Sequence, residues 1–162
     1  MIFLQMVNPP HSAYRSETSR KGWTTEADLP EGETRIDKGV LYKLIHSTGA
    51  RFLKYVNEQN LLEGCVFLQK KETKLYLGML SVSPDLQSRG IGKALMHAAS
   101  GYAKEQGCQS VFIKVISVRH ELIDWYLRQG FVKTGESEPF PADNRFGTPT
   151  QPLEFIIMEK NL

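Results

Sequence analysis

Two glycines and two cationic residues stand together where a strand-like run passes into a helix-like run. Gly90 and Gly92 lie within the segment Gln-Ser-Arg-Gly-Ile-Gly-Lys at residues 87–93, which also contains Arg89 and Lys93. The first N–H groups of a helix have no partner within the helix, and the helix dipole places partial positive charge there. Glycines lack a Cβ atom and let an anion approach the backbone. The segment therefore predicts a phosphate or pyrophosphate site.

Two well-known phosphate-binding motifs do not fit this segment. The phosphate loop of nucleotide triphosphatases requires Gly-x-x-x-x-Gly-Lys-Ser/Thr, but Lys93 is followed by Ala94 and the first glycine position holds Gln87. The dinucleotide fingerprint requires Gly-x-Gly-x-x-Gly, but its third position is Leu95, and no repeating parallel β-α-β pattern follows. The segment therefore predicts neither of these nucleotide-binding folds.

A third pattern fits position by position. Residues 87–92 resemble the Gln/Arg-x-x-Gly-x-Gly/Ala motif of the GNAT superfamily of N-acetyltransferases, and they follow a strand ending Leu-x-Val-x-Pro. Residues 126–131, Tyr-Leu-Arg-Gln-Gly-Phe, resemble the second motif of that family, Tyr-x-x-x-Gly-Phe/Tyr. Residues 13–29, with Ala-Tyr-Arg and Gly-Trp-Thr-Thr-Glu-Ala-Asp-Leu, resemble the N-terminal signature of one GNAT subgroup, where it forms a loop over the acceptor site.

This resemblance implies one domain over residues 1–162 that transfers an acetyl group from acetyl-CoA to a primary amine, with a small-molecule acceptor expected. In such enzymes the amine attacks the thioester directly in a ternary complex. A backbone N–H near Leu80 would stabilise the oxyanion, and Tyr126 would protonate the leaving thiolate. The base is left open between Glu26, Asp28 and a water held by a strand carbonyl.

The site residues implied by the resemblance fall into two groups. The cofactor contacts are Leu80, Ser81, Val82, Gln87, Ser88, Arg89, Gly90, Ile91, Gly92, Lys93 and Tyr126. The acceptor contacts are Tyr14, Trp23, Thr24, Glu26 and Arg119. Two positions depart from the family pattern: Arg119 replaces a frequent asparagine, and the strand at residues 75–82 contains no acid. Taken alone, Tyr126 is better explained as a core residue, since it shares a helical face with Leu122 and Ile123, and the turn at 87–92 favours the cofactor role instead. Residues 14–28 could equally be a surface loop.

The elements that must position these residues predict an α/β fold. The resemblance implies a mixed, mostly antiparallel twisted sheet with helices on both faces. Gly78 marks a bulge or a close backbone approach. Phe140 and Phe146, in the long loop, could cover the site or contact a second subunit. Periodicity and turn residues predict helices at 33–48, 90–106 and 119–129, strands at 51–58, 61–70, 75–83, 109–118, 131–135 and 153–159, and a loop at 136–152.

Composition excludes some further classes of protein function. Apolar residues make up 41% and charged residues 23%, which is ordinary for a globular enzyme, and a net charge of +2 does not indicate a nucleic-acid or membrane partner. We expect no signal peptide, no metal and a cytoplasmic protein, with homodimerisation left open. Cys65 and Cys108 are expected to be buried free thiols, and His46, His97 and His120 to be surface or packing residues.

Two competing functions remain open at this level. A non-catalytic acyl-CoA sensor would keep the turn at 87–93 but would need no Tyr126, and a substitution Tyr126→Phe separates it from an enzyme. A structural or partner-binding domain would use the glycine turn only for its geometry and would bind no CoA.

Overall fold

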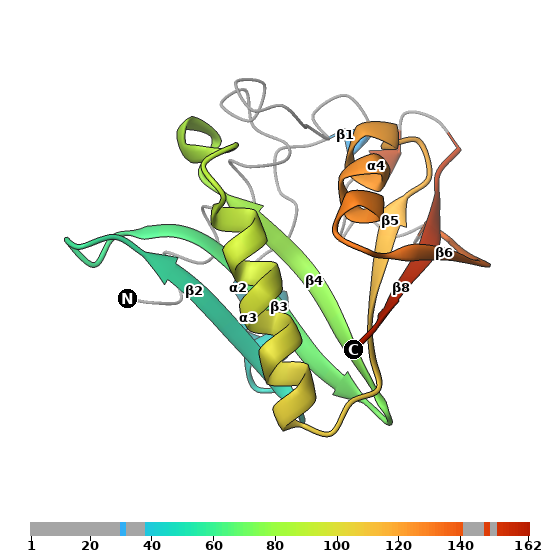
Figure 1. The fold of residues 1–162 in the computed structure, drawn as a ribbon. Helices are drawn as coiled ribbons and strands as arrows, with labels where there is room; N and C mark the ends of the chain where they lie inside the picture. Colours follow the sequence, from blue (N-terminus) through green and yellow to red (C-terminus); the bar gives the residue numbers. More distant parts are fainter. Residues whose placement is uncertain (1–29, 32–37, 141–147, 150–151) are drawn as a thin grey trace.

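The computed structural model of the chain describes residues 30–31, 38–140, 148–149 and 152–162, and these form a mixed α/β fold (Figure 1). The main sheet has the strand order β2-β3-β4-β5-β8-β6, and a separate short pair joins β1 to β7. The strands are β1 (Pro30–Glu31), β2 (Ala50–Val56), β3 (Leu62–Lys71), β4 (Lys74–Val82), β5 (Ser110–Ile116), β6 (Val132–Pro139), β7 (Thr148–Pro149) and β8 (Glu154–Asn161).

Strands β4 and β5 form the single parallel pair among the described strands, and they separate along their length. Their register joins only residues 74–76 to residues 110–112, whereas β5 pairs antiparallel with β8 over its whole length. Figure 1 shows β4 and β5 diverging beyond this short contact. The connection between them is α3 (Ile91–Glu105), as a parallel crossover requires. The sheet is therefore mostly antiparallel and opens at its centre.

Helices cover both faces of the sheet, as predicted. Because successive strand residues point to opposite faces, Phe52 and Leu53 mark the two sides of β2. Leu53 packs in one cluster with Leu95 and Ala99 of α3, which lies in front of the sheet in Figure 1. Phe52 packs with Leu41 of α2 (Lys38–Ile45). The third helix, α4 (His120–Arg128), joins the α3 side through Ile123 and Tyr126.

A bulge in β4 lies beside Gly78 rather than at it. Gly78 pairs with Phe67 and Ser81 with Cys65, so Met79 and Leu80 together face one residue of β3. Met79 has a φ of 51°, in the left-handed region. Gly78 serves a different need, because a Cβ atom there would lie 2.8 Å from the hydroxyl of Tyr76. The neighbour of Gly78 is thus a side chain and not backbone, and the bulge falls one residue later.

The predicted loop at 136–152 is wrong in part. Strand β6 continues to Pro139 along the edge of the sheet, pairing with β8 through Glu138 and Pro139. The polar sequence of this segment predicted a loop, but an edge strand that faces solvent can also be polar. Phe140 is buried, stacks on Phe155 with a ring separation of 5.2 Å, and does not line the cleft that is described below. Phe146 lies outside the described residues.

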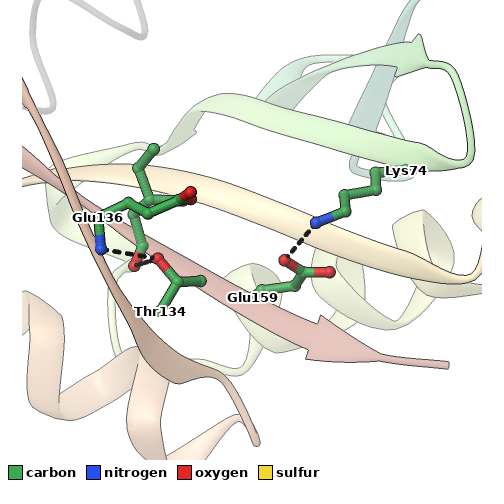
Figure 2. A network of polar contacts seen from close by, with 5 residues as sticks. Lys74, Thr134, Glu136 and Glu159 are labelled. Atoms are coloured by element: carbon green, nitrogen blue, oxygen red, sulfur yellow. Dashed lines mark hydrogen bonds and ion pairs between the residues drawn. The ribbon is translucent and has the colours of Figure 1, made fainter.

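An ion pair crosses the closed end of the sheet, where β4 and β5 still pair (Figure 2). Lys74 Nζ lies 2.8 Å from Glu159 Oε2 on β8. The hydrogen bond from Lys74 lowers the pKa of Glu159 below its ordinary value. Thr134 and Glu136 of β6 form an adjacent contact, in which the Glu136 N–H donates to Thr134 Oγ1.

Replacement Glu159→Gln should make the protein less stable at neutral pH and equal to wild type in acid. A carboxyl with a lowered pKa contributes stability above its unfolded pKa of about 4.3, and that contribution is lost as pH falls through the folded value. Urea unfolding at pH 7 and near pH 3 measures the difference. If the variant were less stable than wild type by the same free energy at both pH values, the lost ion pair would not be the cause.

Replacement Glu72→Gly should stabilise the β3–β4 hairpin. Glu72 is exposed and has a φ of 53°, a conformation that costs an L-residue about 1–2 kcal/mol. Glycine adopts it freely but has more entropy when unfolded, so we expect a net gain of about 0.5–1 kcal/mol in the free energy of unfolding. Glu72→Ala keeps the strained backbone and is the control. Equal gains in both variants would contradict the explanation.

Candidate functional site

A cleft of about 400 Å³ opens between the end of β4, the turn that follows it and α4. The strand contributes Leu80 and Val82 to its wall. Helix α4 contributes Leu122, Trp125, Arg128 and Gln129. The turn and the start of α3 contribute Leu86, Gln87, Ser88, Gly90, Ile91, Gly92 and Lys93. The predicted phosphate turn therefore forms one side of a real cleft.

The turn holds its backbone in the shape of an anion site. A short 3-10 helix, Pro84–Leu86, leads into it, and the Gln87 side-chain amide donates to the carbonyl of Val82 at 3.4 Å. Ser88 and Gly90 have φ values of 66° and 85°. Such left-handed residues between ordinary ones turn successive N–H groups toward a common concave side. The geometry suits an anion bound by backbone amides.

The start of α3 keeps its first N–H groups available. The first helical bond runs from the N–H of Ala94 to the carbonyl of Gly90, so the amides of residues 91–93 precede the helical ladder. Gly90 is the N-cap, makes no side-chain capping bond, and no acidic residue stands in the first turn. An anion in the cleft would supply the missing capping interaction.

The two glycines of the turn lack a side chain for different structural reasons. Gly90 has a positive φ that side chains rarely adopt. At Gly92 a Cβ atom would lie 3.5 Å from the Trp125 ring, which is an ordinary contact distance. The fold therefore tolerates a side chain at Gly92, and its absence leaves space on the cleft side of the helix.

The charge of the cleft is positive. Lys93 and Arg128 line it from opposite walls, and among the described residues that line it none is acidic. Arg89, a predicted cofactor contact, is exposed but lies outside the lining. The two cations that face the cleft come from α3 and α4, so the sequence motif identified only one of them.

Strand β4 presents alternate residues to the cleft. Leu80 and Val82 line it, whereas Ser81 is buried with its hydroxyl donating to the Met79 carbonyl at 3.1 Å. This is the alternation expected of a strand. Of the three predicted strand contacts, the side chain of Ser81 points away from the cleft.

Tyr126 lies beside the cleft rather than in its wall. Its side chain is only 6% exposed and packs edge-on against Phe131 with 5.6 Å between ring centres. The neighbouring Trp125 lines the cleft in its place. Sequence reasoning missed Trp125 and Leu122, although their spacing with Gln129 places all three on one helical face.

The predicted acceptor residues are mostly not described. Tyr14, Trp23, Thr24 and Glu26 lie outside the described residues. Arg119 is described, is 3% exposed, and its Nε donates to Glu121 Oε1 at 3.1 Å. Arg119 occupies the N-cap position of α4 without a side-chain capping hydrogen bond, and it is not in the cleft lining.

The other reactive side chains are placed as expected. Cys65 and Cys108 are buried free thiols, and burial raises the pKa of Cys65 to about 12, which keeps it protonated and unreactive. His46, His97 and His120 are exposed. Within the described ranges, no three metal-ligating side chains gather in one place. Of the helices that the structure describes, none is long and apolar enough to span a bilayer.

Comparisons with known proteins identify the family. The family model described as the acetyltransferase (GNAT) family matches residues 14–131, well over half of the chain, and the chain belongs to this family. Rat N-acetyltransferase 8F1 is 35% identical over 63 residues, which cover 39% of this chain and 28% of that protein. The match thus spans less than a third of the relative's length.

Solved structures agree on the fold. The ribosomal-protein-S18-alanine N-acetyltransferase of Escherichia coli matches with a TM-score of 0.63 at 16% identity, covering 77% of this chain and 76% of that one. The PaiA N-acetyltransferase of Thermoplasma acidophilum, solved in complex with coenzyme A, matches with a TM-score of 0.56 at 21% identity, covering 75% and 67%. At these identities the likeness establishes the fold.

Proposed function

We propose that this chain transfers the acetyl group of acetyl-CoA to a primary amine, with a small molecule as the acceptor. The observation that carries the proposal is the cleft whose one wall is the amide-rich turn at 88–93 and whose lining holds Lys93 and Arg128 without an acidic residue. Such a cleft suits the phosphates of CoA. The solved relative with bound coenzyme A supports the same ligand.

The cofactor would lie along the opening of the sheet. Its pyrophosphate would accept hydrogen bonds from the amides of residues 88–93. Its pantetheine arm would run beside residues 80–82, where β4 and β5 have diverged, in the manner of an added strand. The thioester would then lie near the bulge at Met79 and Leu80, and the Leu80 backbone is our candidate for contact with the oxyanion.

The acceptor first loses one proton from its ammonium form to solvent, and the neutral amine attacks the thioester carbonyl carbon. The nitrogen of the tetrahedral intermediate then gives a second proton to a base. As the carbon–sulfur bond breaks, the thiolate takes a proton from the Tyr126 hydroxyl, and the tyrosinate regains a proton from solvent. Glu26, Asp28 or a water held by a strand carbonyl would be that base. No covalent enzyme intermediate is formed.

A non-catalytic acyl-CoA sensor is the second candidate. It is favoured by the burial of Tyr126 outside the cleft lining and by the absence of an acidic residue in β4, whose sequence is KLYLGMLSV. A sensor would bind acetyl-CoA in the same cleft without turnover. Binding alone therefore does not separate the two functions.

The experiment that tests the proposal is an acetylation screen with purified protein, acetyl-CoA and a panel of primary amines. Release of free CoA thiol is followed optically, and products are identified by an added acetyl mass. Amine-dependent turnover above the rate without protein would support the enzyme. Tight acetyl-CoA binding with no turnover on any amine would favour the sensor.

A further inference from the structure

Arg128 is the one cation on the α4 wall of the cleft, and the turn at 88–93 does not include it. It stands in the last turn of α4 and its side chain is exposed. Trp125, one helical turn earlier, lines the same cleft. The two residues share a face because positions three apart are neighbours on a helix. Arg128 thus faces the ligand space across from the predicted pyrophosphate site.

Among the described residues of its own helix, the side chain of Arg128 forms no ion pair with a carboxylate. Asp124 lies four residues earlier, a spacing at which helical ion pairs form. Within the residues that the structure describes, no ion pair joins Asp124 to Arg128, whereas Arg119 pairs with Glu121. The end of α4 is also capped by another group, since Lys160 Nζ donates to the Gln129 carbonyl at 2.8 Å.

CoA carries its phosphates at two places, the pyrophosphate and a separate phosphate on the ribose 3′ oxygen. The amides of the turn suit the first. The 3′-phosphate is attached to the ribose, several bonds away from the pyrophosphate, and so it would need a separate hydrogen-bond donor outside the turn. A guanidinium group presents a planar fork of N–H donors that matches phosphate oxygens. Of the two cations in the lining, Arg128 is the one that the turn does not contain.

We propose that Arg128 binds the 3′-phosphate of CoA and so selects CoA over its 3′-dephosphorylated form. This inference rests on the proposed function, since it assigns a specificity-determining residue to the same cofactor site. The simpler role for Arg128 is favourable interaction with the negative end of the α4 dipole. That role would affect stability and would leave the preference between the two cofactors unchanged.

The test is a binding cycle with two ligands and three proteins. Dissociation constants for CoA and for dephospho-CoA are measured by titration calorimetry at one salt concentration. The proteins are wild type, Arg128→Gln and Lys133→Gln. Lys133→Gln is the matched control, because it also removes one exposed cation, but from β6 and outside the cleft. Wild type should prefer CoA by about ten- to a hundredfold, the range expected for charge-assisted hydrogen bonds.

We expect Arg128→Gln to lower the affinity for CoA to the level of the affinity for dephospho-CoA. The affinity for dephospho-CoA itself should not change. Unchanged dephospho-CoA binding also shows that the variant is folded. Lys133→Gln should keep the wild-type preference. Equal binding of both ligands by wild type, or equal weakening of both by Arg128→Gln, would overturn the inference but leave CoA binding intact. Binding of neither ligand by wild type would overturn the proposed function as well.

Discussion

Replacement Gly92→Glu should reduce the affinity for acetyl-CoA at least a hundredfold while the protein stays as stable as wild type. The new side chain would enter the cleft and set a carboxylate against the pyrophosphate. A hundredfold loss corresponds to about 2.7 kcal/mol. Stability should hold because a Cβ atom at Gly92 meets Trp125 at an ordinary 3.5 Å, and an acidic residue in the first turn favours the helix dipole.

The matched control is Gly101→Glu on the same helix. Gly101 is exposed, and a Cβ atom there would meet no atom within 4 Å. The change of residue and charge is identical, but it lies away from the cleft. We expect unchanged acetyl-CoA binding and a gain of about 0.5–1 kcal/mol from better helix propensity. Calorimetry and thermal unfolding measure both quantities. Equal acetyl-CoA affinity in the two variants would place the cofactor elsewhere.

Replacement Tyr126→Phe should lower kcat about a hundredfold or more and leave KM for acetyl-CoA nearly unchanged. The substitution removes only the hydroxyl that would protonate the thiolate, and general acids contribute about 10²–10⁴ in rate. The ring would keep its edge-on contact with Phe131, so the fold should not change. Steady-state kinetics with the best amine from the acetylation screen measure the effect.

Tyr102→Phe is the control for loss of a tyrosine hydroxyl. Tyr102 lies on α3, half-buried, with the guanidinium carbon of Arg51 at 5.8 Å from its ring centre. It should retain wild-type kcat. If Tyr126→Phe also retained it, Tyr126 would be a packing residue and another group, or solvent, would protonate the thiolate.

The parts of the fold predicted best are those encoded locally. Both hairpins, α3 and the turn at 87–93 follow from turn residues and from periodicity within short segments. Gly130 ends α4 with a φ of 91°, the conformation expected of a glycine after a helix. The turn at 87–93 is where motif and backbone geometry agree most closely, because glycine positions report directly on allowed dihedral angles.

The features that were missed depend on contacts across the chain. Met79 adopts a left-handed φ at the bulge, and a methionine carries no sequence signal for that conformation. Strand β6 is polar and gains its structure from pairing with β8. Trp125 and Arg128 line the cleft from α4, but which face of this helix is turned toward the cleft depends on how α4 packs on the sheet. Burial is settled by packing, which no single residue reveals.

The most direct test of the central claim is a titration of ¹⁵N-labelled protein with acetyl-CoA, followed by two-dimensional amide NMR. If backbone amides hold the pyrophosphate, the largest shifts should fall on the N–H groups of residues 88–93, with a second set at residues 80–82. Gly101, farther along α3, should be unaffected. Shifts confined to other parts of the chain, or no shifts at millimolar acetyl-CoA, would contradict the assignment of this turn and cleft as a CoA site.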